Sequence, residues 1–541
     1  MDNKSVENNG CSSQTKQEKN PYSIDAEDAN EEKFSYVDTK DTSLLRSRNN
    51  LYVEWRKDNT GKGKVCELGD VVTVDWNSIY HSIINSDLTK EKRKIQEDNF
   101  ATEFFNFSKK IAKVIISEIN NNVKNESKQV KPIVAGIMGG EKYICGGVFF
   151  KIAFKHVSFI DSYHYSKFLN IEKKNMDDFT EFSKTDPESF NVSPSVFFTY
   201  LGYSVLASSI LPINKDTLLT GSNDGFYTFS FCKDINPIIE KIGKNWHLSK
   251  HVLTYCESSV DTAFDIEYHK GTDGRFYALD MTRLSLTKTN SDEKIQWTNQ
   301  FRMDFLNTYC KDLCACTDTF IKPFKNHSSD LDSMLSIYDE QLNKMVKNLE
   351  SFDDYNQVIP SDYIHSFGVN LNSIIDLNRN TVKKDSKTWN LIQFTSAVKT
   401  MKRLWYISCI GLQDEEELND FAIFFLKKLF DFSNTNYFLL NLKWLTDTLS
   451  ADVNHILYEI NPDTFFKVFN KEKFFAACLT EIGILIDIPI SDFITNISCS
   501  HFTIKQKYIP VKFPNLINIE RLDKIKFETQ NKDKVFKTVK K

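Results

Sequence analysis

The spacing of apolar residues divides the chain into a polar start, a β-rich middle and a helical second half. Residues 1–46 are polar, charged and poor in aliphatic side chains, so they are predicted to be disordered. From Phe100 to Ile119, apolar residues recur mostly at three- and four-residue steps, which predicts one long amphipathic helix. Between residues 130 and 286, dense apolar runs are broken by glycine pairs, and this texture predicts mainly strands. Residues 51–55 and 71–74 are short β-type runs as well.

The clearest strand pattern lies between residues 262 and 284. Three apolar residues alternate there with three polar ones, namely Phe264, Ile266 and Tyr268 with Asp265, Glu267 and His269. Gly271-Thr-Asp-Gly274 supplies turn chemistry, because glycine adopts positive φ at little cost. Apolar residues return from Phe276 to Leu279. The segment therefore predicts a β-hairpin.

Helical periodicity returns after about residue 296, over residues 335–349, 391–412, 418–449 and 465–488. No period of 20–50 residues is evident, so a helical solenoid is not predicted. The pattern predicts an α+β protein in which a central, mainly antiparallel sheet domain with packed helices precedes an all-α C-terminal domain. We divide it into a disordered tail (1–46), the α+β domain (47–310), the helical domain (311–525) and a basic polar tail (526–541).

Composition and charge narrow the class of protein. The 541 residues carry a net charge of −5, so the chain has no overall basic field of the kind that drives non-specific nucleic-acid binding. The chain has eleven cysteines and a polar N-terminus without an apolar leader, which together indicate reduced thiols in a cytoplasmic protein. Residues 189–214 lack charge but contain Pro194, Gly202 and Pro212, so we expect buried strands there and no integral membrane segment.

Four motifs follow one another in the middle of the chain. They are Asp75-Trp-Asn77, the stretch Y-L-G-Y-S-V-L-A-S-S-I-L-P from Tyr200 to Pro212, Gly221-Ser-Asn-Asp-Gly225, and Gly271-Thr-Asp-Gly-Arg-Phe-Tyr-Ala-Leu-Asp280 with Arg283 following. In this order they resemble the clustered-mitochondria (Clu) domain, with a core signature over about residues 75–310. Leu201 and Ser204 stand where the family has arginines, and Leu284-Ser-Leu286 replaces its "R-P-D" or "P-P-D". Neither its ubiquitin-like N-terminal region nor its tetratricopeptide repeats are evident, so the chain resembles a short, divergent member.

The resemblance implies a cytosolic protein associated with messenger RNA, with mitochondrial distribution and with translation initiation factors. Protein partners are therefore expected, and messenger RNA or a ribonucleoprotein is a second class of partner. No cofactor is expected.

Two glycine loops are candidate anion sites. Backbone N–H groups of Gly271, Asp273 and Gly274, together with Arg275, could cradle a phosphate. An ordinary tight turn that Asp273 caps explains the same residues, and we favour it. Gly221, Ser222, Asp224 and Gly225 form the second loop, which lacks the lysine of a P-loop and also reads as a turn. Asp280 and Arg283 follow at a three-residue spacing and could pair with each other.

Metal and nucleic-acid sites have weaker signals. Asp265, Glu267 and His269 would share one strand face and could bind a divalent metal, although a solvated strand face is the favoured interpretation. Cys310, Cys314 and Cys316 with His327 lack the second ligand pair of a zinc site, so we interpret them as core thiols, the first two one turn apart on a helix. Lys402-Arg-Leu-Trp-Tyr406 could stack on a nucleic acid but reads better as core with a charged rim.

The favoured function is a non-catalytic interaction module for cytosolic protein or ribonucleoprotein partners. The alternative is a divergent metal-dependent phosphotransferase in which the glycine loops hold phosphates and Asp280 binds the metal. A membrane-associated factor that uses residues 189–214 is a third. An enzyme predicts that Asp265, Asp273 and Asp280 converge in one concave pocket, whereas a binding module does not.

Overall fold

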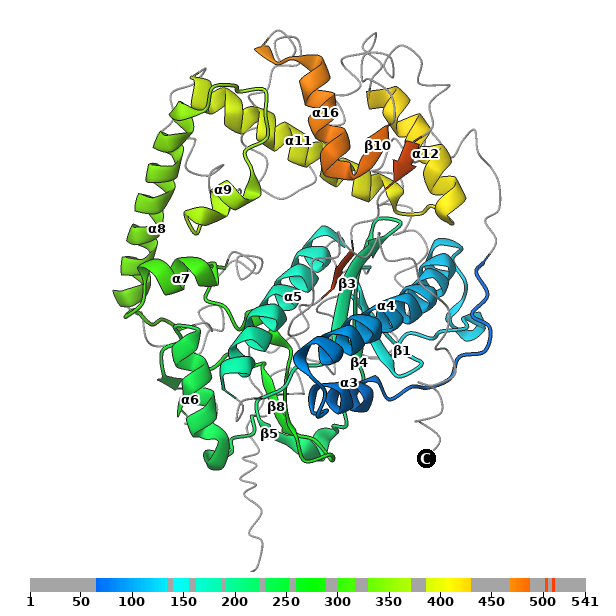
Figure 1. Cartoon of the computed structure of the whole chain (residues 1–541), viewed down its shortest axis with the longest axis vertical. Coiled ribbons are helices and arrows are strands. Elements are labelled where there is room, and N and C mark those ends of the chain that lie inside the picture. The colour runs from blue at the N-terminus through cyan, green and yellow to red at the C-terminus, as the bar shows by residue number, and fades with distance from the viewer. Residues whose placement is uncertain are drawn as a thin grey trace, which may run out of the picture.

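A five-stranded antiparallel sheet has helices on both faces, and it takes four strands from residues 141–209 and one from residues 508–510 (Figure 1). The computed structural model describes residues 65–133, 140–154, 162–186, 190–222, 229–252, 259–288, 300–316, 329–370, 386–429, 468–486, 502–504 and 508–510. The strand order is β1-β2-β4-β3-β12, with β1 at Glu141–Cys145, β2 at Val148–Ile152, β3 at Ser195–Tyr200, β4 at Tyr203–Ser209 and β12 at Tyr508–Pro510. The uncharged stretch 189–214 thus supplies the two strands β3 and β4, as the sequence predicts.

Each face of this sheet has its own helical cover. Helix α3 (Trp76–Ile84) and helix α4 (Lys90–Asn120) contribute to the apolar cluster that contains Phe150 and Val205. Helix α5 (Ser162–Thr185) contributes to a second cluster, which contains Phe197 and Leu206. Neighbouring residues of one strand therefore enter different cores, as the two-residue period of a strand requires.

A smaller sheet carries the predicted hairpin. Its order is β5-β8-β9, with β5 at Leu218–Thr220, β8 at Glu267–Lys270 and β9 at Phe276–Leu279. Strands β8 and β9 pair antiparallel from Glu267 opposite Leu279 to Lys270 opposite Phe276, so the hairpin is confirmed. The 3-10 turn η4 (Met281–Arg283) follows β9 directly.

The predicted solvated face of β8 is wrong in two respects. The strand begins only at Glu267, so Asp265 lies before it in a turn. His269 is buried like its neighbour Tyr268, because β8 is the middle strand and both of its faces are covered. In this strand, polar and apolar residues alternate in the sequence, but exposed and buried side chains do not.

Helices dominate the second half, as predicted. Helices α8 (Ser329–Asn348), α9 (Ser361–Ser366), α11 (Lys387–Cys409), α12 (Glu415–Leu429) and α16 (Lys471–Ile482) form an arc above the sheet in Figure 1. Short strands β10 (Ile484–Ile486) and β11 (Phe502–Ile504) pair with each other, so this half also has some β structure. The described residues confirm an α+β protein with a helical C-terminal part.

Several local predictions were confirmed and others were wrong. The long helix predicted over residues 100–119 is the C-terminal part of α4. Helix α5, and α6 (Asn236–Asn245), lie within the stretch predicted to be mainly strands. Residues 71–74 form no strand, and α7 (Met303–Tyr309) ends before Cys310, so Cys310 and Cys314 do not share a helix. The predictions for residues 1–46, 51–55 and 526–541 lie outside the described residues.

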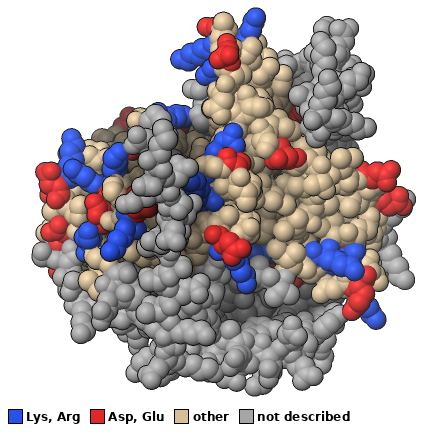
Figure 2. All heavy atoms as spheres, turned by 90° about the horizontal axis from the view of Figure 1, so that it is seen from below, with Lys and Arg blue, Asp and Glu red and all other residues tan. Residues whose placement is uncertain are grey.

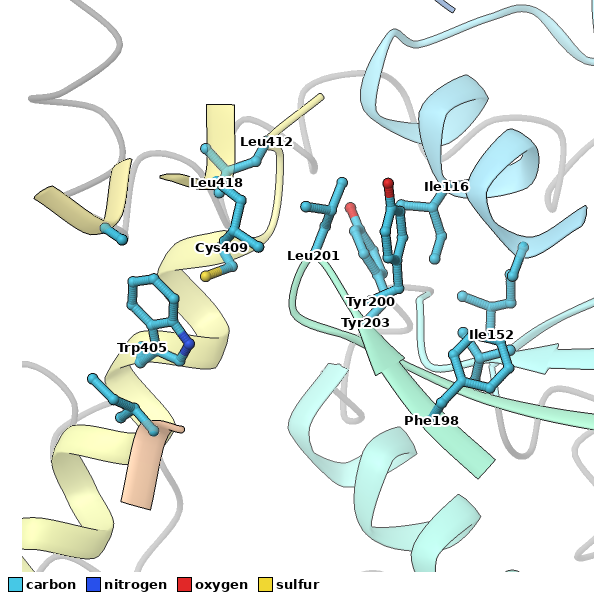
Figure 3. Close-up of a cluster of buried hydrophobic side chains, with 14 of the residues drawn as sticks. Ile116, Ile152, Phe198, Tyr200, Leu201, Tyr203, Trp405, Cys409, Leu412 and Leu418 are labelled. Atoms are coloured by element: carbon cyan, nitrogen blue, oxygen red, sulfur yellow. The ribbon is translucent and has the colours of Figure 1, made fainter. Parts of the chain in front are cut away.

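The helical half packs directly on the tip of the β3–β4 hairpin (Figure 3). Tyr200, Leu201 and Tyr203 at this tip belong to the same buried cluster as Trp405 and Cys409 of α11. Gly202 has φ +83°, and a Cβ built on it would lie 2.2 Å from the backbone oxygen of Tyr406. The boundary placed near residue 310 stays a prediction, but apolar side chains from both sides of it fill one core.

Candidate functional site

The loop Gly271–Arg275 is closed by its own hydrogen bonds. The N–H of Gly271 donates to the carbonyl of Arg275 at 2.7 Å, and the N–H of Gly274 donates to the carbonyl of Gly271 at 2.9 Å. Asp273 Oδ1 accepts the N–H of Arg275 at 3.2 Å, while Asp273 Oδ2 accepts from Arg275 Nη1 at 2.7 Å. Three of the polar groups proposed to hold a phosphate are therefore engaged in the turn itself.

This loop is joined to the Asp75-Trp-Asn77 motif. The Tyr277 hydroxyl donates to Asp273 Oδ2 at 2.6 Å and accepts a hydrogen bond from Asn77 Nδ2 at 2.8 Å. Asp75 caps α3, the helix that carries Asn77, by accepting from the N–H of Ser78. Two motifs of the resemblance, 200 residues apart, are thus parts of one contact.

The same contact contains polar atoms that have no hydrogen-bond partner among the described residues. They are Asn77 Oδ1 and His81 Nε2, both on the same side of α3 and both buried. Burial and the nearby Arg275 guanidinium lower the pKa of His81 to about 4, so its imidazole is neutral at physiological pH. For Asp273, burial acts in the opposite direction to its hydrogen bonds from Tyr277 and Arg275, and the bonds hold its pKa below the usual value.

A buried lysine organises the other end of the β8–β9 hairpin. Lys151 of β2 lies 2.7 Å from Glu172 of α5 and 2.9 Å from Asp280, which directly follows β9. The side chains of Lys151 and Glu172 are 11% and 8% exposed, whereas that of Asp280 is 51% exposed. Burial lowers the lysine pKa, but the two carboxylates outweigh it and hold the pKa of Lys151 above its usual value. Asp280 has φ +54°, an unusual conformation for a residue other than glycine.

Glu267 and His269 lie next to this ion cluster. His269 Nε2 lies 3.0 Å from Glu267 Oε2, and His269 Nδ1 lies 3.0 Å from the Thr217 hydroxyl of the neighbouring segment. Burial is the main influence on Glu267 and raises its pKa, against the hydrogen bond from His269. The two side chains thus form a hydrogen-bonded pair in which both nitrogens of His269 have partners.

Arg283 pairs with Asp265 and not with Asp280. Arg283 Nε donates to Asp265 Oδ2 at 2.6 Å, and the Arg283 side chain is 2% exposed. The turn that holds Arg283 is further fixed by Asn175 of α5, whose Nδ2 donates to the carbonyl of Met281 at 2.7 Å. The pairing of Asp280 with Arg283, considered from their spacing, is therefore wrong, because η4 turns the two side chains toward different partners.

The second glycine loop begins where β5 approaches β8. Gly221 exchanges two backbone hydrogen bonds with Ser230, and a Cβ on it would lie 2.2 Å from the carbonyl oxygen of Ile266. Its glycine is thus required for close packing of two chain segments. Ser222 is buried. Asp224 and Gly225 lie outside the described residues.

The three aspartates of the enzyme hypothesis do not converge. Asp265 and Asp280 lie at the same end of the hairpin, but each is bound to a different cation. Asp273 lies at the opposite end, beyond the four-residue strands β8 and β9. At ~3.3 Å per residue, about 13 Å of strand separates the two ends. Gly221 and the Gly271–Arg275 loop are separated in the same way, since β5 pairs with β8.

Several other candidate residues that the structure describes are buried or lie in ion pairs. Among the described residues no group of three or more His, Cys, Asp or Glu side chains is placed to hold a metal ion. Cys310 is buried, and burial raises its pKa to about 11, which keeps it a thiol; His327 lies outside the described residues. Leu404 and Trp405 are buried, and Lys402 pairs with Glu481, as the core interpretation of that segment expects.

Sequence reasoning missed Lys151, Glu172 and Asn175. Lys151 has a signal, because it is a single lysine in the apolar run Val-Phe-Phe-Lys-Ile, where burial forces a charge to find a partner. Glu172 and Asn175 were missed together with α5, which was not predicted as a helix.

The surface gives two further facts. Figure 2 shows basic and acidic side chains interspersed over the described part of one face, without a broad area of one sign. In the part of the chain that the structure describes, no helix combines the length and apolar character that crossing a membrane requires.

Residues 75–290 match the family model described as "CLU: Clustered mitochondria". No curated protein and no solved structure is significantly similar to the chain. The match begins at the Asp75-Trp-Asn77 motif and ends just after the η4 turn, so it contains every residue of the two hydrogen-bonded clusters described above.

Proposed function

We propose that this chain, which carries a clustered-mitochondria (CLU) domain over residues 75–290, is a non-catalytic interaction module with a role in mitochondrial distribution. One observation carries the proposal: polar side chains of the family-like motifs bind one another. Asn77, Tyr277, Asp273 and Arg275 form one such chain of hydrogen bonds, and Asp280 is held by Lys151. Polar side chains that bind one another in this way stabilise the folded structure of the domain.

A phosphotransferase is supported less well. Phosphoryl transfer needs phosphate-binding groups and a metal-binding carboxylate around one reacting centre. Here Asp280 and the Gly271–Arg275 loop lie at opposite ends of the hairpin. Lys151 is a cation near Asp280, but two carboxylates already neutralise it. The arrangement therefore offers little positive charge to an incoming nucleotide.

Protein partners fit the surface better than messenger RNA does. Nucleic-acid affinity comes largely from basic side chains gathered on one face. The face in Figure 2 carries both signs interspersed. Cytosolic protein partners are therefore our first expectation. A ribonucleoprotein would be bound through its protein component, and such binding would link the chain to translation.

The proposal is tested first by thermal shift of the purified chain with ATP and Mg²⁺, and separately with RNA. A ligand at about 100 times its dissociation constant adds ~2.7 kcal/mol to the free energy of unfolding, which raises the midpoint measurably. We expect no shift with nucleotide. A shift with ATP and Mg²⁺ that disappears in Asp280→Asn would favour the phosphotransferase instead.

A second test is made in cells that express the protein. Deleting the gene is expected to disturb the distribution of mitochondria, and both the wild-type chain and Asp280→Asn are expected to restore it. Rescue by the wild-type chain alone, from variants present at equal amounts, would show that the carboxylate has a chemical role. An undisturbed distribution after deletion would refute the role in mitochondrial distribution.

A further inference from the structure

Strand β12 reaches the five-stranded sheet from a distant part of the chain. Tyr508, Ile509 and Pro510 pair antiparallel with Phe198, Phe197 and Val196 of β3, respectively. The other four strands lie within residues 141–209, so β12 comes from roughly 300 residues further along. It appears in Figure 1 as the dark red strand beside β3. A separate segment thus occupies what would otherwise be the edge of the sheet.

We propose that this edge of β3 is a strand-addition site for an extended apolar peptide of a protein partner, and that residues 508–510 occupy it within the chain. The inference rests on the proposed interaction function and names the class of partner. Strand addition is a general mode of peptide recognition, in which backbone hydrogen bonds supply affinity and alternate side chains supply specificity.

The chemistry of β3 defines the occupant. Val196 and Phe198 belong to one buried cluster and Phe197 belongs to the other, so the three residues of β3 that pair with β12 are apolar on both faces. Ser195 and Thr199 flank Phe197 on its face. Phe198 also packs edge-on against Phe105 of α4, with ring centroids 5.6 Å apart. An added strand extends both faces by one position. Opposite residues 196–198, its side chains therefore meet apolar neighbours on either face, which favours uncharged, β-branched or aromatic residues at those positions.

Among the described residues, the present occupant pairs with only part of the edge. Strand β3 has six residues and β12 has three, which pair with residues 196–198 of β3. One of the three is Pro510, which has no N–H to donate. A longer peptide without proline would form more backbone hydrogen bonds along the same edge. The geometry therefore permits exchange of the occupant in favour of a partner.

The proline also predicts which backbone groups hold the strand. Successive N–H groups of a strand point to opposite sides, and proline is tolerated where its nitrogen faces away from the neighbouring strand. Pro510 and Tyr508 then share one orientation, and Ile509 has the other. We expect the N–H of Ile509 to point toward β3 and that of Tyr508 to point away.

Peptides that differ by one methyl group test this expectation. The probe is a fluorescent peptide of residues 505–513, made unmodified, N-methylated at Ile509, and N-methylated at Tyr508 as the matched control. Each is titrated against the full chain and against its Ile509→Pro variant, in which the occupant is weakened. We expect the unmodified peptide and the Tyr508-methylated peptide to bind the variant at least tenfold more tightly than the wild-type chain. The Ile509-methylated peptide is expected to lose at least tenfold in affinity for the variant.

The outcomes separate the inference from the proposed function. Equal binding of the three peptides, or no binding to a variant that unfolds cooperatively, would overturn strand addition and leave the interaction module untouched. If Ile509→Pro does not fold, the same comparison of methylated peptides at high concentration on the wild-type chain decides the matter. If two differently tagged copies of the chain form mixed dimers, the strand that binds this edge comes from a second copy of the chain, and the proposed partner peptide is wrong.

Discussion

Two glycines with nearly the same φ have very different surroundings. Gly202 has φ +83° and Gly274 has φ +82°, so alanine at either position adopts a left-handed conformation. That conformation costs roughly 1–2 kcal/mol in each case. A Cβ at Gly274 meets nothing within 4 Å, whereas a Cβ at Gly202 lies 2.2 Å from the Tyr406 backbone oxygen. Only Gly202→Ala must therefore push α11 away from the β3–β4 hairpin.

The difference between the two variants measures that displacement. Overpacking a well-packed core typically costs about 1–3 kcal/mol. We therefore expect Gly274→Ala to lose about 1–2 kcal/mol and Gly202→Ala to lose about 2–5 kcal/mol, as read from urea unfolding midpoints. Hydrogen exchange is expected to quicken at the end of α11 in Gly202→Ala alone. Equal losses in the two variants, with unchanged exchange in α11, would refute the packing of α11 on this hairpin.

Three further predictions concern the hydrogen-bonded clusters. Tyr277→Phe removes a hydroxyl that is hydrogen-bonded to an ionised carboxylate and to a buried amide, so we expect its free energy of unfolding in urea to fall by about 2–3 kcal/mol. The control Tyr268→Phe loses one neutral hydrogen bond and is expected to lose about 1 kcal/mol. Lys151→Met leaves the buried carboxylate of Glu172 unpaired and is expected to cost about 3–5 kcal/mol, with partial recovery when Glu172→Gln is added; no recovery would contradict the ion cluster. Burial raises the pKa of Glu267, so the contribution of Glu267 to the free energy of unfolding falls as pH rises from its unfolded pKa through its folded pKa. Glu267→Gln should therefore raise the urea midpoint at pH 7.5 but not at about pH 4. A gain that is the same at both pH values would exclude this titration.

Local signals predicted the hairpin and its turn well. Glycine positions, alternation and the short apolar run after the turn are properties of neighbouring residues, so the sequence alone placed β8, β9 and the self-capped loop. The long helix that includes Phe100 and Ile119 was predicted for the same reason. In these segments the local preference and the tertiary environment favour the same structure.

Long-range pairing could not be predicted in the same way. Asp280 and Arg283 are three residues apart, yet the first binds Lys151 of β2 and the second binds Asp265. A spacing of three residues favours a contact only inside a helix of sufficient length, and η4 has three residues. The partner of Asp280 lies 129 residues away, a separation for which a single sequence carries no signal.

The shared core has a consequence for synthesis on the ribosome. The apolar cluster that covers one face of the sheet includes strand residues up to Ala207 and is completed only by residues such as Phe474 and Ile482. About 270 residues must be made in between, which takes roughly 15–55 s at the usual rates of translation. Until α11 has been made, the nascent sheet presents Tyr200, Leu201 and Tyr203 without their cover. This protein is therefore expected to need a chaperone longest while its second half is being made, and to release it when α16 emerges.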